Sequence, residues 1–137
     1  MFSTFEHTAD LGLKAGAESL ESLFVEAARG LMNMLVDRPE LIRPVEQRRF
    51  EISSSERDYL FFDWLNELLF AFESNGWLGA TFNVQIEGDT LVATVGGETL
   101  DRDRHQPGHE VKAITYHGLK VCEESPGQWS AEVIVDI

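Results

Sequence analysis

Three short stretches of the chain carry side chains that can bind a cation or move a proton. The first, Glu6 to Gly12, places a carboxylate, an imidazole, a hydroxyl and a second carboxylate within five residues, before a glycine that permits a tight turn. His7 is the candidate general base of this stretch. By spacing alone, the stretch is either a site or an ordinary acidic strand end.

The second stretch is Val133 to Ile137, where a β-branched strand stops without a polar tail. A strand that stops in this way can hold its α-carboxylate in a fixed position beside the side chain of Asp136. Two oxygen anions one residue apart suit a hard cation such as Ca²⁺ or Mg²⁺, which takes several oxygen ligands. The alternative interpretation is a strand that simply ends there.

The third stretch runs from Lys112 to His117. In a strand, Lys112 and Tyr116 point to one face and His117 to the other. Lys112 would form a simple ion pair, hold a phosphate or organise a cluster of acids. The phosphate-binding G-x-x-x-x-G-K-[ST], the G-x-S-x-G elbow and the zinc motif H-E-x-x-H do not occur.

The charge balance narrows the class of partner. The chain carries 24 acidic and 11 basic side chains, a net charge of −13 at pH 7. Binding of a nucleic-acid backbone needs a basic face, so direct RNA or DNA binding is not expected, whereas a basic protein or a multivalent cation is. Between Asp58 and Asp101 lie eight acids and no Lys or Arg, which indicates a solvated face or a docking surface for a basic partner.

Length and composition predict one folded domain, 1–137, with 43% hydrophobic and 26% charged residues. The single cysteine, Cys122, excludes an internal disulfide and favours a reducing compartment, which we expect to be the cytoplasm. We expect neither a signal peptide nor a membrane span, because no suitable apolar run occurs.

Two amphipathic helices should position these residues. Apolar residues at helical spacing predict a helix over 19–36, capped by Ser19, and a second over 56–74. Ser55 with Asp58 resembles a capping box at the start of the second helix.

The rest of the chain alternates like β-strands, over 2–7, 11–15, 45–52, 82–86, 91–95, 111–121 and 129–135. The predicted fold class is α+β: a single-domain two-layer sandwich with a mostly antiparallel sheet and two main helices on one face. The polar segment Gly96 to Glu110 is expected to be a long loop, either a lid or partner contact or a floppy connection.

In this order, the stretches resemble the archease family. Five motifs in register over nearly the whole chain carry the resemblance: Phe5-Glu6-His7-Thr8-Ala9-Asp10-Leu11-Gly12, Leu23-Phe24 with Ala27-Ala28, Asp63-Trp64-Leu65-Asn66-Glu67-Leu68-Leu69, Val111-Lys112-Ala113-Ile114-Thr115-Tyr116-His117 and Val135-Asp136-Ile137. The resemblance implies a cytoplasmic, non-enzymatic partner of an RtcB-type RNA ligase. Such a protein promotes guanylylation of the ligase and multiple turnover in tRNA splicing or RNA repair.

The resemblance also implies a divalent-metal site, held here by Asp10, Asp136 and the main-chain carboxylate of Ile137. Ca²⁺ is the expected ion, with Mg²⁺ and Mn²⁺ compatible with the same oxygen ligands. No catalytic residue is implied. Lys112 is the next functional candidate, followed by His7 and Glu67.

Two other functions stay open at this point. The chain is alternatively a metal-dependent phosphohydrolase that uses Asp10 and Asp136 with His7 as base. A third possibility is a chaperone-like binding module with an exposed apolar patch.

Overall fold

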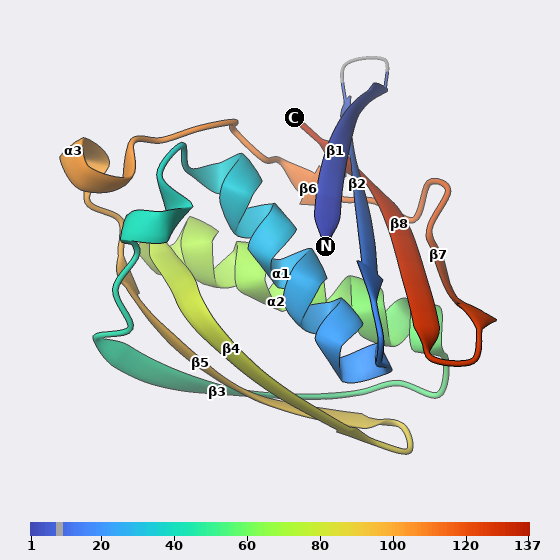
Figure 1. The fold of residues 1–137 in the computed structure, drawn as a ribbon. Coiled ribbons are helices and arrows are strands. Elements are labelled where there is room, and N and C mark those ends of the chain that lie inside the picture. Colours follow the sequence, from blue (N-terminus) through green and yellow to red (C-terminus); the bar gives the residue numbers. More distant parts are fainter. Residues whose placement is uncertain (8–9) are drawn as a thin grey trace.

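In the computed structural model, which describes residues 1–7 and 10–137, two long helices lie between two antiparallel sheets (Figure 1). The elements are β1 Phe2–His7, β2 Asp10–Ala17, α1 Leu20–Leu35, the 3₁₀ turn η1 Pro39–Leu41, β3 Glu46–Ser53, α2 Arg57–Asn75, β4 Trp77–Glu87, β5 Thr90–Thr99, α3 Arg102–His105, β6 Ala113–Ile114, β7 Lys120–Ser125 and β8 Gln128–Asp136. The predicted α+β class is confirmed.

The strands divide between two sheets, where the sequence led us to expect one. The larger sheet has the order β1-β2-β8-β6, with β7 also paired to β8, and the smaller has the order β3-β5-β4. Helix α1 contacts both β2 and β4, so it needs two apolar sides. Its Gly30 lets the larger sheet approach closely, because a Cβ atom there would lie 2.4 Å from Leu13 Cδ1.

Both helices form within a residue or two of their predicted bounds. The backbone amide of Ser22 donates to Ser19 Oγ at 3.1 Å, which confirms the predicted cap of α1. The predicted capping box of α2 is wrong, because Glu56 is the N-cap and makes no side-chain cap hydrogen bond. Helix α2 ends at Gly76, whose left-handed backbone (φ 67°) lets its amide donate to Phe72 O at 2.7 Å.

The predicted strand over 111–121 is wrong as a continuous element. Only Ala113–Ile114 and Lys120–Ser125 are strands, and both pair with β8. Between them the hydroxyl of Thr115 donates to Ile134 O at 2.9 Å, and Gly118 turns the chain with φ 67°. The regular strand is therefore interrupted by the side-chain hydrogen bond of Thr115 and by the left-handed Gly118.

The expected long loop over 96–110 is also wrong. Its first residues complete β5, and Arg102–His105 form the short α3. The amides of Gly108 and His109 donate to Leu35 O at 2.9 Å and Met34 O at 2.8 Å, so the end of the segment is tied to the end of α1. The polar composition of the segment gives no sign of these backbone hydrogen bonds.

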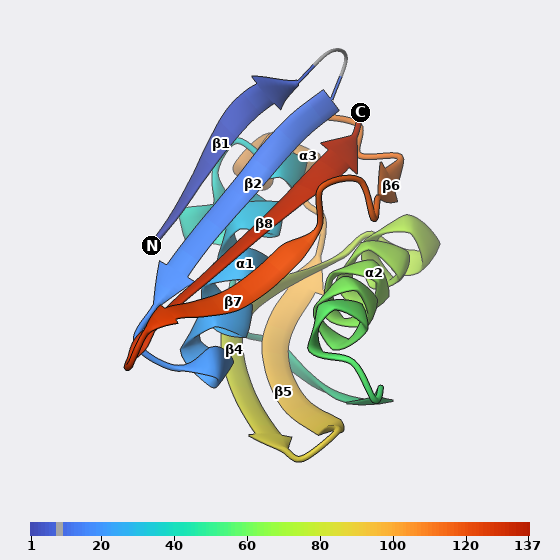
Figure 2. The ribbon, with the colours of Figure 1, turned by 90° about the vertical axis from the view of Figure 1, so that its right-hand side faces the viewer.

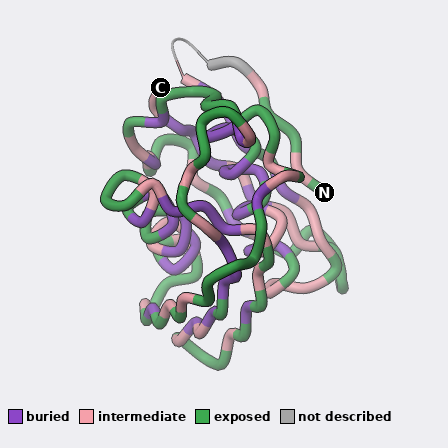
Figure 3. The backbone as a smooth tube through the Cα atoms, turned by 90° about the vertical axis from the view of Figure 1, so that its left-hand side faces the viewer, coloured by how far each residue is buried: buried purple, intermediate pink, exposed green. Residues whose placement is uncertain are grey.

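Two tryptophans and two phenylalanines are among the largest fully buried side chains of the described residues: Phe24, Phe61, Trp64 and Trp77. Phe24 and Phe61 meet edge to face, and Trp64 Nε1 donates to Phe24 O at 2.9 Å, so α1 and α2 are joined by packing and by a hydrogen bond. The most buried stretches lie toward the middle of the molecule (Figure 3). No helix in the described part of the chain is long and apolar enough to cross a membrane.

Candidate functional site

Asp10 and Asp136 are direct cross-strand partners in the antiparallel β2–β8 ladder. Directly opposed residues point to the same face of a sheet, with Cβ atoms about 5 Å apart. Both aspartates are half-buried. The ladder therefore places two carboxylates side by side, although 126 positions separate them along the chain.

The segment that contains β6 lies beside the two aspartates, because β6 pairs with β8. The amide of Lys112 donates to Asp136 O at 2.8 Å, and Ala113 lies opposite Asp136 on the side away from β2. Figure 2 shows the start of β2, the end of β8 and β6 together at one end of the larger sheet. The sheet thus gathers Asp10, Asp136, Lys112 and the adjacent Ile137; we call this group the acidic edge.

The two weaker candidates from the sequence are His7 and Glu67. His7 pairs with Asp10 through the backbone of the β1–β2 ladder, but its side chain lies outside the described part of the structure. Glu67 is exposed on α2, a separate element from the strands that form the acidic edge.

The side chains of Asp10 and Asp136 provide two carboxylates at the acidic edge, so the atoms they could offer to a metal are oxygens. Among the described residues, no group of three or more His, Cys, Asp or Glu side chains is placed to hold a metal ion. Facing carboxylates repel, and a hard divalent cation relieves that repulsion.

A second polar cluster, formed by Glu98, Arg104 and His105, was not predicted from the sequence. Arg104 Nη2 donates to Glu98 Oε1 at 3.0 Å, and the fully buried His105 contacts Glu98 Oε2 at 2.9 Å through Nε2. The amide of Asp101 donates to His105 Nδ1 at 2.9 Å, which assigns the imidazole proton to Nε2, so that Nε2 donates to Glu98.

The hydrogen bond from Arg104 is the main cause that lowers the pKa of Glu98 to about 2; the amide of Arg43 and His105 act in the same direction, against the effect of burial. The cluster connects β5 to α3, and within it the guanidinium of Arg104 neutralises the carboxylate of Glu98. Its one signal in the sequence is the neighbouring pair of cationic and imidazole side chains, Arg104-His105, shortly after an isolated glutamate.

The model of the archease protein family (MTH1598/TM1083) matches residues 2–137. This chain belongs to the archease family. It is 35% identical to the archease of Thermococcus gammatolerans, over 97% of this chain and 96% of the relative. It is 38% identical to the archease of Methanopyrus kandleri, over 96% of each chain.

Solved structures agree with the fold of this archease. The solution structure of Methanobacterium thermoautotrophicum protein 1598 superposes with a TM-score of 0.86 at 35% identity, covering 99% of this chain and 98% of the other. The crystal structure of an archease from Thermotoga maritima, described as a possible chaperone, has a TM-score of 0.62 at 24% identity and covers 100% and 98% of the two chains. At that identity, the second likeness supports the fold alone.

Proposed function

We propose that this archease is a non-enzymatic accessory protein of an RtcB-type, GTP-dependent RNA ligase in the cytoplasm. It promotes guanylylation of the ligase and supports multiple turnover in tRNA splicing or RNA repair. Membership of the archease family supports an accessory role toward a protein partner. The observation that carries the proposal is the direct pairing of Asp10 with Asp136, because two directly opposed carboxylates offer oxygen ligands to one divalent cation.

In this proposal Asp10, Asp136 and the main-chain carboxylate of Ile137 hold a divalent ion, with Ca²⁺ preferred over Mg²⁺ or Mn²⁺. When bound, the ion supplies positive charge that neutralises the carboxylates and coordinates further oxygen atoms. Lys112 is exposed beside Asp136 and adds a point charge at the rim, suited to a phosphate group of the complex. His7 and Glu67 have weaker roles.

The charge of the chain supports a role beside the RNA enzyme and not on the RNA. A net charge of −13 disfavours contact with a phosphate backbone. We therefore propose that the ligase holds the RNA and that the archease touches the ligase alone.

The test of this function is guanylylation of a purified RtcB-type ligase by GTP, with and without the archease. We expect a faster first guanylylation and repeated turnover when the archease is present. No effect of the intact protein would refute the proposal. Turnover of generic phosphoesters by the archease with metal alone would favour the phosphohydrolase function, and capture of unrelated unfolded chains would favour the chaperone-like function.

The third metal ligand has its own test. Two glycines appended after Ile137 move the terminal carboxylate away from Asp136 while leaving the ladder intact. We expect weaker binding of Ca²⁺ and weaker activation of the ligase. If both survive the extension, the carboxylate of Ile137 is not a ligand.

A further inference from the structure

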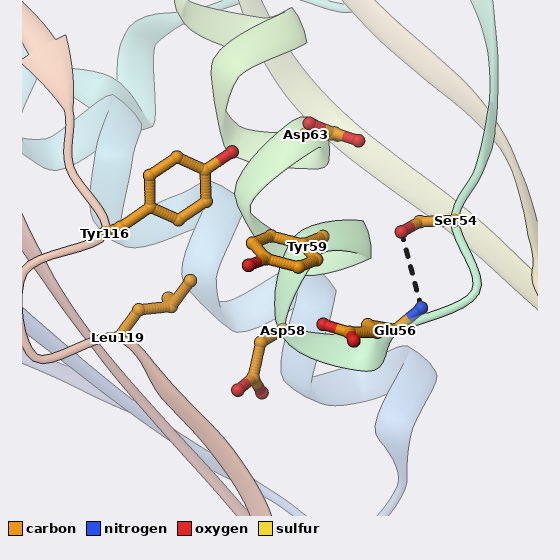
Figure 4. A pocket seen from close by; sticks show the side chains of 7 residues that line it. All are labelled: Ser54, Glu56, Asp58, Tyr59, Asp63, Tyr116 and Leu119. Carbon is orange, nitrogen blue, oxygen red and sulfur yellow. Dashed lines mark hydrogen bonds between the residues drawn. The ribbon is translucent and has the colours of Figure 1, made fainter.

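A surface groove of about 650 Å³ lies between the first half of α2 and the turn that follows β6. It is lined by Glu56, Asp58, Tyr59, Asp63, Tyr116 and Leu119, together with Ser54 (Figure 4). We call it the tyrosine groove. Its lining residues include three carboxylates and no Lys or Arg.

Stacked aromatic rings form one wall of the tyrosine groove. Tyr116 stacks on Phe62 with ring centroids 3.9 Å apart and planes 14° apart, and Tyr59 meets Tyr116 edge to face at 5.4 Å. Although packed in this way, Tyr59 and Tyr116 remain 46% and 54% exposed. Burial, and then the charge of Asp63, raise the pKa of Tyr116, so its ring stays neutral. The wall offers open ring surface next to a carboxylate.

The acids of the tyrosine groove differ from other acids on the surface. Elsewhere, acids pair with cations of the same chain: Glu46 lies 3.0 Å from Arg48, and Glu51 lies 3.2 Å from Arg49. Within the described residues, no ion pair neutralises Glu56, Asp58 or Asp63.

The nearest cation along the sequence is directed elsewhere. Arg57 lies between Glu56 and Asp58, but its guanidinium lies over the ring of Trp129, 4.7 Å from the ring centroid. The groove therefore keeps its negative charge and its open rings for another molecule.

We propose that the tyrosine groove binds an arginine side chain in a basic segment of the partner ligase, an inference that rests on the proposed function. A guanidinium is planar, so it can stack on an aromatic ring while its N–H groups donate to a carboxylate. Tyr116 and Asp63 together supply this ring and this carboxylate. An anionic partner, such as an RNA backbone, would meet three like charges here.

The position of the groove fits a docking role. The segment from Lys112, whose amide donates to Asp136 O, to Tyr116 spans at most about 14 Å even when fully extended. A partner with an arginine in the tyrosine groove therefore lies beside the acidic edge. The groove anchors the ligase, and the acidic edge acts on it.

Binding of the full-length archease to the ligase, measured by isothermal titration calorimetry, tests the inference. Asp63 is the best position to change, because it lies beyond the first turn of α2. An acid within the first turn would also stabilise the helix dipole, so its replacement would change the stability of the helix as well. We expect Asp63→Asn and Tyr116→Leu each to raise the Kd about tenfold, the effect of losing one charge-assisted or stacking contact. Tyr116→Phe keeps the ring and should bind like the wild type.

The matched control is Glu87→Gln, which removes one exposed acid outside the groove. Its Kd should stay unchanged, and circular dichroism should show that all variants are folded. Unchanged affinity in both Asp63→Asn and Tyr116→Leu would overturn the inference.

Activation separates this inference from the proposed function. At concentrations well above their Kd, the groove variants should activate guanylylation as fully as the wild type, because they retain the acidic edge. If the wild type never activates the ligase, the proposed function fails. If the wild type activates it while the groove variants bind with unchanged Kd, only the groove inference fails.

Discussion

Glu98 and the Asp10–Asp136 pair are two partly buried acidic sites that differ in their described neighbours. Glu98 is bound by Arg104 and His105 of the same chain, and its side chain is 12% exposed. Asp10 instead has another acid, Asp136, as its direct cross-strand neighbour. A carboxylate that is bound by cations of its own chain stabilises the fold, whereas two directly opposed carboxylates offer oxygen ligands to a divalent cation.

The largest expected effect is the response of the acidic edge to Ca²⁺. At a concentration of 100 times its Kd, an ion that binds only the folded state raises the free energy of unfolding by about 2.7 kcal/mol. We expect this gain in the wild type and not in Asp136→Asn, as measured by urea unfolding with and without Ca²⁺. Asp89→Asn, an exposed acid in the β4–β5 turn, is the control and should keep the gain. An equal gain in Asp136→Asn would exclude Asp136 as a ligand.

The next effect compares the two acidic sites without any metal. Glu98→Gln should lower the free energy of unfolding by about 2 kcal/mol, because Arg104 and His105 lose the charge they bind. Asp136→Asn in a chelator should cause no loss, since it removes one of two repelling charges. Urea unfolding at pH 7 measures both. If the two variants lose equal stability, the contrast between the sites does not exist.

A smaller effect concerns the free energy of unfolding at acidic pH. The pKa of Glu98 is held at about 2, below its ordinary 4.5, mainly by Arg104. Because the folded-state pKa is lowered, the stabilisation from charged Glu98 is complete above pH 4.5 and is lost as the pH falls toward 2. The wild type should therefore lose stability more steeply than Glu98→Gln across this window. Parallel curves of unfolding free energy against pH would show that Glu98 is not the group that titrates.

The smallest effect is expected at Glu67. It is exposed on α2 and belongs to neither the acidic edge nor the lining of the tyrosine groove. Glu67→Gln should change activation of the ligase by less than about twofold, within the usual range of a surface substitution. A loss comparable to that of Asp10→Ala would place Glu67 at the interface with the ligase.

Local signals predicted the helices well, because they depend on neighbours along the chain. Ser19 begins α1 and the left-handed Gly76 ends α2, each where short-range sequence rules place it. The division into two sheets depends on long-range contacts, such as that of Gly30 with Leu13. The anchoring of 96–110 depends on backbone amides, which composition does not reveal.

The candidate site was predictable in part. Resemblance pointed to Asp10 and Asp136, but their direct opposition depends on the register of β2 with β8, which no local pattern encodes. The tyrosine groove was missed because Tyr59 and Tyr116 lie far apart in the sequence and meet only through α2 and the turn after β6. Their one signal was the acidic stretch that begins at Asp58.

The most direct measurement is guanylylation of an RtcB-type ligase by GTP in the presence of wild-type archease or its Asp10→Ala variant. Each is supplied at a saturating concentration, and Glu87→Gln serves as the charge-matched control. We predict that the wild type and the control accelerate guanylylation, and that Asp10→Ala binds the ligase but gives at most about one tenth of the acceleration. Full acceleration by Asp10→Ala would contradict the role of the acidic edge.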